Sequence, residues 1–255
     1  MIYLNIFITL LLLCLPSQPV RADTAPINES TMEKAIALLQ ESDLSRGNVS
    51  GIVWDIDIET KSKDKIEKNS LQVFVKGTAC LAVYQSPSKV KGRKLLMKDR
   101  NMWFIKPGLS KPVPISPRQK LLGGASNGDI ASTDYAGDYT IESFIEDRFN
   151  TEPCFLYELK AKNKKTTYDR IRYWVSKKRK VGLKAEFFTL SGKKFKTAFF
   201  EYNHTIPLNG EDRLFVSKMT ILNAMIKTDK TVMAYNNINI REISASSFNL
   251  NLLVR

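Results

Sequence analysis

The sequence predicts a mainly β (α+β) fold: an incomplete antiparallel β-barrel of about ten to eleven strands, with helices covering its concave face. Two observations lead to this prediction. After one helical segment near the N-terminus, apolar and polar residues alternate in run after run, which is the period of a half-buried strand. These runs follow one another through short polar links, which favours an antiparallel meander. The segments available to cover the concave face are residues 30–45 and the segment after residue 128.

The first element is a helix predicted at residues 30–45. Ser30 and Glu33 have the spacing of a capping box, with Ser30 as the N-cap. Apolar residues then recur at helical intervals, and Gly47 is predicted to end the helix. A helix with one apolar face needs a surface to cover, and the sheet provides one.

The first half of the sheet begins with a strand in which Trp54, Ile56 and Ile58 share one face and acidic residues occupy the other. Two hairpins are predicted next, at residues 71–76 with 80–84 and at residues 93–97 with 102–106. Residues 107–128 are rich in proline and glycine and predict a long loop with one short strand near 113–115. Loops of this length are often functional.

The second half is predicted to start with a short helix at residues 140–149. Further strands are predicted at residues 155–161, 169–175, 183–190, 195–202, 214–222 and 231–239. A hairpin turn is expected at residues 191–194.

The N-terminus predicts an exported protein. Residues 1–15 are nearly all apolar, Pro16 and Pro19 end the run, and small residues precede a cleavage site after Ala22. We therefore expect a signal peptide at residues 1–22.

The rest of the chain, residues 23–255, is expected to be a single domain.

Two other interpretations of the N-terminus are weaker. A membrane anchor would need an apolar run of roughly 18–20 residues. Lipidation of Cys14 would need a small residue before it, and Leu13 stands there.

The chain is strongly basic, with a formal net charge of +13 at pH 7. Lysines are spread over several runs instead of being gathered on one element, and an exported protein meets little nucleic acid. We therefore expect no nucleic-acid partner. Two interpretations stay open: peripheral contact with anionic lipid head groups, and solvated lysines that protect sheet edges.

The sequence predicts no catalytic residue, no metal site and no cofactor. His204 is the single histidine, and no nucleophile elbow or cysteine-protease signature accompanies it. Asp129, Asp134 and Asp138 match no Ca²⁺-loop spacing, so helix capping and turn formation are the simpler roles. A hydrolase acting on envelope material is disfavoured for these reasons.

Cys80 and Cys154 remain once the signal peptide is removed. Both lie in or beside apolar, strand-like runs, and export would permit a disulfide bond between them. Buried free thiols are the alternative.

A set of short motifs carries a family resemblance. They are Tyr84-x-Ser86-Pro87, Gly92-Arg93, residues 101–107 (NMWFIKP), Ile115-Ser116, Gly128-Asp129, Asp134-Tyr135, Tyr168-Asp169, Trp174-Val175 and Gly192-Lys193-x-x-Lys196. Their order and spacing resemble those of the outer-membrane lipoprotein-sorting proteins, relatives of the periplasmic lipoprotein carrier LolA, over roughly residues 30–250. The lipoprotein carriers have an Arg-Pro turn that matters for handing cargo on. Ser86-Pro87 stands at the equivalent place, so the resemblance assigns that role to no arginine here.

The resemblance implies a LolA/LolB-like half-barrel in the periplasm that binds lipoproteins or other acylated or lipidic cargo and helps to move it towards the outer membrane. Such cargo needs a carrier, because each CH₂ group exposed to water costs about 0.8 kcal/mol. The implied partners are that cargo and envelope membrane proteins or an exporter, and we expect a non-enzymatic monomer. The alternative is a non-enzymatic accessory or docking protein of an envelope export complex, which a filled interior would favour.

Five apolar residues are predicted to line the cavity. Trp54, Ile56 and Ile58 are chosen from the first strand, and Trp103 and Ile105 from the strand in the motif region. Ordinary core packing is the alternative for each of them, because an apolar face of period two is most often core.

Overall fold

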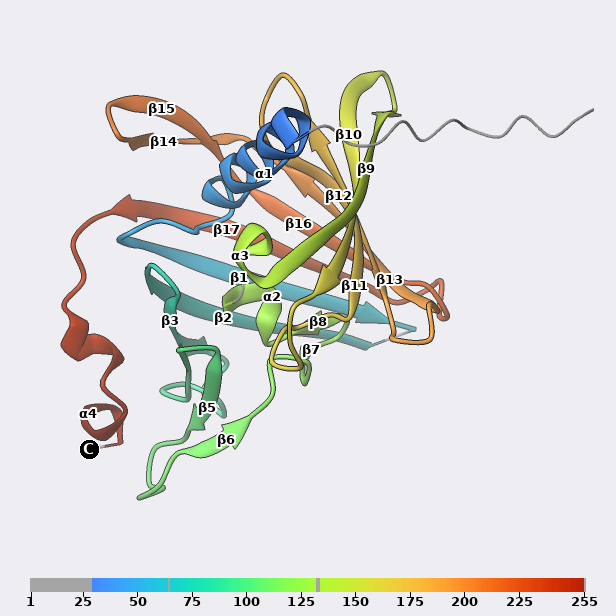
Figure 1. Cartoon of the computed structure of the whole chain (residues 1–255). Helices are drawn as coiled ribbons and strands as arrows, with labels where there is room; N and C mark the ends of the chain where they lie inside the picture. The colour runs from blue at the N-terminus through green and yellow to red at the C-terminus, as the bar shows by residue number, and fades with distance from the viewer. Residues whose placement is uncertain (1–28, 64, 132–133, 255) are drawn as a thin grey trace, which may run out of the picture.

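The structure is a computed structural model that describes residues 29–63, 65–131 and 134–254. The predicted signal peptide, its cleavage site and Cys14 lie outside these residues. The predicted mainly β fold with one large antiparallel sheet is confirmed (Figure 1). Among the helices of the described residues, none has the length and apolar character required to cross a membrane.

The helices are α1 (Glu29–Leu44), α2 (Gly128–Ala131), α3 (Tyr135–Asp138), the 3₁₀ helix η1 (Ala245–Phe248) and α4 (Leu250–Leu253). The strands of the first half are β1 (Ile52–Ser62), β2 (Lys65–Lys76), β3 (Ala79–Ser86), β4 (Lys94–Lys98), β5 (Asn101–Ile105), β6 (Val113–Ile115), β7 (Lys120–Leu122) and β8 (Ala125–Ser126). The strands of the second half are β9 (Tyr139–Phe149), β10 (Glu152–Ala161), β11 (Arg170–Ser176), β12 (Gly182–Phe188), β13 (Lys194–Glu201), β14 (His204–Leu208), β15 (Glu211–Phe215), β16 (Lys218–Asn223) and β17 (Lys230–Ile240).

The main sheet has 13 strands in the order β6-β5-β4-β3-β2-β1-β17-β16-β13-β12-β11-β10-β9. Its first strand in the sequence, β1, pairs with its last, β17, near the middle of the sheet. The sheet therefore consists of two meanders that run outward from this pair, and it stays open, with β6 and β9 at its edges. Two small hairpins, β7-β8 and β14-β15, lie outside it.

The prediction of a helix at residues 140–149 is wrong, because this segment is the edge strand β9. Its apolar residues Ile141, Phe144 and Ile145 fit a helical spacing, so the local pattern is ambiguous. Pairing with β10 along the whole length of β9 makes this segment a strand, and the two strands are joined by a turn in which Asn150 has a φ of 56°. Asparagine tolerates this left-handed conformation better than most residues.

The predicted strand count is too low. The hairpins β7-β8 and β14-β15 were not expected, and the single strand predicted at residues 214–222 is two strands, β15 and β16. The turn between β14 and β15 is formed by Asn209 and Gly210, both with positive φ. Asn-Gly is a strong sequence signal for such a hairpin. This signal, and not the periodicity, would have predicted the β14-β15 hairpin.

Helices cover the concave face of the curled sheet, as predicted. Leu39 of α1, Ile130 of α2 and Tyr135 of α3 belong to the same buried cluster as Trp54 and Ile56 of β1. Figure 1 shows α1, α2 and α3 inside the curve of the sheet. The predicted α1 is confirmed to within one residue at each end, but because it begins at Glu29, Ser30 lies inside the helix and is not its N-cap.

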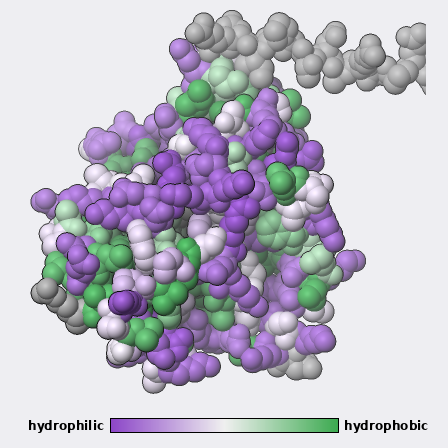
Figure 2. Space-filling view, turned by 60° about the horizontal axis from the view of Figure 1, so that its bottom comes forward, coloured by the Kyte–Doolittle hydropathy of each residue, from purple (hydrophilic) through white to green (hydrophobic). Residues whose placement is uncertain are grey.

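The convex face is covered by the C-terminal segment. A second buried cluster joins residues of β1 to β5 to this segment: Val53, Leu81, Leu96, Ile105, Ile243 and Phe248. Two lysines of the sheet hold the segment, since Lys76 Nζ and Lys94 Nζ each donate to one of its backbone carbonyls at 2.9 Å. On the face shown in Figure 2, hydrophilic residues form most of the surface and hydrophobic residues lie between them in separate patches.

Candidate functional site: the covered concave face

Three of the five predicted cavity residues face the covered interior. Trp54, Ile56 and Ile58 are at most 1% exposed and pack in the main core cluster. The structure therefore places them on the predicted face, and contact with a ligand stays a prediction for all three.

The other two face the opposite side of the sheet, and their predicted place on the concave face is wrong. Leu95 pairs with Phe104, and Leu96 pairs with Trp103. Because side chains alternate along a strand, Phe104 points towards the interior while Trp103 and Ile105 point to the convex face. The C-terminal segment packs against them there. Only the register of β4 and β5, which one sequence does not reveal, distinguishes the two faces.

The loop that carries α2 is anchored to the sheet by a buried ion pair. Lys196 Nζ of β13 lies 2.7 Å from Asp129 Oδ2 of α2, and both side chains are at most 4% exposed. Tyr168 Oη donates to Asp129 Oδ1 at 2.6 Å, and Ser126 N donates to Asp129 Oδ2 at 2.8 Å. Burial lowers the pKa of Lys196, and the neighbouring Asp129 opposes this shift. Three residues of the sequence motifs thus meet in one anchor.

Close backbone approach fixes the same loop. Thr60 and Thr231, a pair across β1 and β17, lie against Gly123, whose φ is +55°. A Cβ atom on Gly123 would stand 1.7 Å from Thr60 Oγ1, and one on Gly128 would stand 1.9 Å from Thr167 Oγ1. Glycine is therefore required at both positions for the loop to reach the sheet.

The three aspartates that were considered as a Ca²⁺ site have separate partners. Asp129 belongs to the anchor, Asp134 caps α3, and Asp138 pairs with Arg100 at 2.5 Å. No three His, Cys, Asp or Glu side chains of the described residues lie together in a way that could hold a metal ion. The predicted capping role is therefore confirmed for Asp134, while Asp129 and Asp138 form ion pairs.

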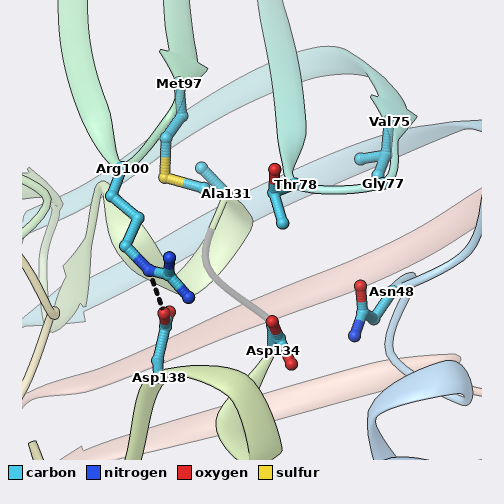
Figure 3. Close-up of a pocket in the computed structure, with 9 residues that line it drawn as sticks. All are labelled: Asn48, Val75, Gly77, Thr78, Met97, Arg100, Ala131, Asp134 and Asp138. Carbon is cyan, nitrogen blue, oxygen red and sulfur yellow. Dashed lines mark hydrogen bonds and ion pairs between the residues drawn. The ribbon is translucent and has the colours of Figure 1, made fainter. Parts of the chain in front are cut away.

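Figure 3 shows the small pocket beside the Arg100–Asp138 pair, where Arg100 reaches from the β4–β5 turn towards α3. The volume of this pocket is about 20 Å³. Its lining residues are Asn48, Val75, Gly77, Thr78, Met97, Arg100, Ala131, Asp134 and Asp138. Such a volume suits a single water molecule, so this pocket is too small for an acyl chain.

Few polar contacts hold α1 over the interior. Tyr157 Oη donates to a backbone carbonyl of α1 at 3.1 Å. Asp43 Oδ2 accepts from Ala136 N of α3 at 2.8 Å. At the surface, Glu41 forms an ion pair with Arg213 of the β14-β15 hairpin. Most of the attachment of α1 is therefore apolar packing.

An apolar groove opens between α1 and β9, with a volume of about 360 Å³. Its lining residues are Met32, Ile36, Leu39, Ala136, Tyr139, Thr140, Ile141 and Lys162. Ile36 is 40% exposed there, and Lys162 at the rim donates to two carbonyls of α3. The volume lies at the low end of the range for ligand pockets, about 300–1,000 Å³.

A polar cluster lies beneath the C-terminal end of α1. The guanidinium carbon of Arg46 stands 4.2 Å from the ring centre of Tyr135, 5.2 Å from that of Phe200 and 5.9 Å from that of Tyr173. Four buried atoms of this cluster have no hydrogen-bond partner among the residues that the structure describes: Asp43 Oδ1, Arg46 Nη1, Tyr173 Oη and Tyr202 Oη. Buried polar groups are usually paired, so a concentration of unpaired ones marks a place to explain.

Burial sets the protonation of this cluster. It raises the pKa of Tyr173 and Tyr202, so both hydroxyls stay protonated and can donate. It also raises the pKa of Asp43 well above its usual range, although Arg46 opposes that shift. Asp43 therefore keeps its proton to a higher pH than an exposed aspartate does, beside a guanidinium that is always charged.

Sequence reasoning missed the roles of these residues. Asp129, Tyr168 and Lys196 stand in the motifs, and their motif membership was the only available signal. Arg46 stands in a turn directly after a helix, where nothing in the sequence distinguishes it from a solvated arginine.

Cys80 and Cys154 are both buried free thiols, so the disulfide bond considered for them is not formed. They lie on β3 and β10, which are separated by seven strands in the order of the sheet. Burial raises the pKa of the Cys80 thiol to about 12.

One open antiparallel sheet with helices over its concave face is the fold class of the LolA-like lipoprotein-sorting proteins. The LolA superfamily protein NE2245 from Nitrosomonas europaea has a similar structure, with a TM-score of 0.75 and 26% identity, over 84% of this chain and 96% of that one. A putative outer-membrane lipoprotein-sorting protein domain from Vibrio parahaemolyticus gives a TM-score of 0.74 at 18% identity, over 88% and 99% of the two chains. A DUF1329 family protein from Desulfovibrio piger ATCC 29098 gives 0.72 at 21% identity, over 90% and 100%.

Residues 76–255 match the model of a family that is described as "uncharacterized protein", and the chain belongs to that family. The predicted resemblance to the LolA-like lipoprotein-sorting proteins is confirmed. A search of curated protein sequences gave no match.

Proposed function

We propose that this protein is a non-enzymatic carrier that binds the acyl chains of a lipid or lipoprotein between α1 and the concave face of the sheet, and moves them through the periplasm towards the outer membrane. The groove between α1 and β9 is the observation that carries the proposal. It is apolar, open to the surface and continuous with the covered interior through Leu39 and Tyr139. The similarity to lipoprotein-sorting structures supports the same class of cargo.

Cargo larger than one chain requires α1 to move. The interior beneath α1 is filled by large side chains that are almost fully buried, among them Trp54, Tyr157, Tyr173 and Phe215. Opening is feasible because the polar contacts of α1 are few, whereas the loop with α2 is anchored by the Asp129–Lys196 pair. In this proposal α1 is the moving cover and the α2 loop is the fixed one.

The compartment is part of the proposal. We infer export through the predicted signal peptide, with cleavage after Ala22. N-terminal sequencing of the protein recovered from a periplasmic extract tests it, and recovery of an intact Met1 in the cytoplasmic fraction would contradict it.

The test of cargo binding begins with the native protein. Organic extraction and mass spectrometry of protein purified from its own periplasm should recover acyl lipid in stoichiometric amount. In vitro, a fluorescent palmitoyl probe should bind the wild type, and Ile36→Glu, which puts a charge on the wall of the groove, should weaken binding by about tenfold or more. Leu190→Glu is the matched control, because Leu190 is 79% exposed in the β12–β13 turn, away from the groove.

The filled interior favours one second candidate, a docking protein of an envelope export complex. If the purified protein carries no lipid and binds no acyl probe, the carrier proposal fails and the docking function becomes the better one. Equal binding by wild type and Ile36→Glu would place the acyl site elsewhere.

A further inference from the structure

The cluster around Arg46 contains a positive charge without a bound counter-charge. Arg46 is 5% exposed, and within the part of the chain that the structure describes no ion pair joins it to a carboxylate, although the carboxyl group of Asp43 lies near enough to act on it electrostatically. Its guanidinium faces aromatic rings instead, and its Nη1 atom has no partner in the protein. Buried charges in proteins are normally paired, so the cluster lacks one negative group.

The carboxyl group of Asp43 does not supply this group. One of its oxygens accepts from Ala136 N and the other has no partner. It forms no hydrogen bond to Arg46. Among the described residues no carboxylate bonds to Arg46, so a bound anion is the group that would complete the cluster.

Further donors surround the same place. The hydroxyls of Tyr173 on β11 and Tyr202 after β13 are buried and unpaired. Gly182 of β12 makes room for one of them, since a Cβ atom there would stand 1.8 Å from Tyr173 Oη. Three unpaired donors from three elements thus lie in one buried cluster, a chemistry that suits an oxyanion.

The cluster adjoins the apolar groove. Tyr139 lines the groove, and its ring centre lies 5.5 Å from that of Tyr135. The guanidinium of Arg46 lies over the ring of Tyr135, at 4.2 Å from its centre. Movement of α1, which carries part of the groove wall and leads directly into Arg46, would join the two sites. The apolar part of a ligand would lie in the groove and its charged end at Arg46.

We propose that Arg46, Tyr173 and Tyr202 form the head-group site of the carrier, which binds a carboxylate or phosphate at the end of an acyl chain. This inference rests on the proposed carrier function and narrows it to anionic amphiphiles. A neutral amphiphile with the same chain would fill the groove but leave Arg46 without a counter-charge.

Competition with the palmitoyl probe tests the site. Three ligands compete for the purified full chain: palmitate, hexadecanol and monopalmitoyl phosphatidic acid. The wild type should prefer palmitate or the phosphatidic acid over hexadecanol by about tenfold or more, as expected for charge-assisted hydrogen bonds. Arg46→Met should remove this preference and leave hexadecanol affinity within about threefold of the wild type. The better of the two anions identifies carboxylate or phosphate as the natural head group.

Two further variants separate binding from stability. Tyr173→Phe and Tyr202→Phe remove only hydroxyls that have no partner in the protein, so their unfolding midpoints should not fall. Each should weaken binding of the anion several-fold, by about the value of one hydrogen bond, without changing hexadecanol affinity. Arg213→Met is the control for a loosened helix, because it removes the surface ion pair of α1 and leaves the cluster intact.

The outcomes are distinguishable. Equal binding of hexadecanol and the two anions by the wild type, or an unchanged preference in Arg46→Met, would refute the head-group site while the carrier function stands. The same loss of preference in Arg213→Met would also refute it. Failure of all three ligands to bind would remove the carrier function together with this inference.

Discussion

Replacing Lys196 with methionine is expected to destabilise the protein far more than replacing a lysine two residues away on the same strand. Lys196→Met keeps the length of the side chain and its contacts with the rings of Tyr168 and Phe187, which lie 4.6 and 5.0 Å from the ammonium. It leaves the buried carboxylate of Asp129 without its cation.

The size of the effect follows from the burial of the pair. Removing one partner of a buried ion pair costs about 3–5 kcal/mol. Asp129 retains the hydrogen bonds from Tyr168 and Ser126, so the low end, about 3 kcal/mol, is expected. Lys194→Met is the matched control: its side chain is 43% exposed and its partner Glu186 keeps a second lysine at 2.8 Å. The loss there should be under about 1 kcal/mol.

Urea unfolding followed by tryptophan fluorescence measures the difference. With an m-value of about 2–3 kcal/mol/M, Lys196→Met should lower the midpoint by roughly 1 M or more. The double variant Lys196→Met with Asp129→Asn has no charge left in the anchor and should recover part of the loss. The reasoning is refuted if Lys196→Met costs no more than Lys194→Met, or if the double variant is less stable than Lys196→Met alone.

Three further predictions concern the core. Gly47→Ala should cost more than Gly192→Ala in unfolding free energy, by about 1–3 kcal/mol: both glycines have positive φ, but a Cβ on Gly47 would lie 2.7 Å from Trp54 Cη2 and one on Gly192 meets open space. Burial raises the pKa of Asp43, so the folded state keeps a proton at pH values above the usual aspartate pKa of about 3.9, where the unfolded state has lost it. The free energy of unfolding of the wild type should therefore fall as the pH rises above about 4. Asp43→Asn should lack this fall in urea titrations between pH 4 and pH 7. A maleimide should label Cys80 only after unfolding, with no reducing agent needed, since this thiol is buried and free; labelling that requires reduction would contradict the structure.

The sequence was informative where local patterns decide the structure. The helix α1, the strand β1 and the hairpins β2-β3 and β4-β5 follow from periodicity and turn residues. Most of their boundaries lie within two residues of those predicted, but β2 begins at Lys65, six residues before its predicted start. The segment of β9 shows where the local pattern fails, because its apolar spacing suits a helix and only the pairing with β10 makes it a strand. Tertiary pairing overrides weak local preference.

The candidate site was less predictable because it is built from distant segments. The Asp129–Lys196 contact joins positions 67 residues apart, and no local pattern relates them. The assignment of Trp103 to the wrong face has the same origin, since a shift of one residue in strand register exchanges the two faces of a sheet. Trp54 was placed correctly because its own strand has one acidic face and one apolar face.

The pairing of β1 with β17 has a consequence for the order in which the molecule can be assembled. Thr60 and Thr231, which meet across this pair, are 171 positions apart. A chain under synthesis can therefore form the β1 to β6 meander early, but β1 then presents an unpaired, apolar edge until nearly the whole chain has been made. Such an edge is a template for pairing with other chains, and sheets that depend on contacts between distant positions fold slowly. The chain consequently needs protection from aggregation during most of its synthesis, and a truncation that removes β17 would leave two incomplete half-sheets in place of one shortened sheet.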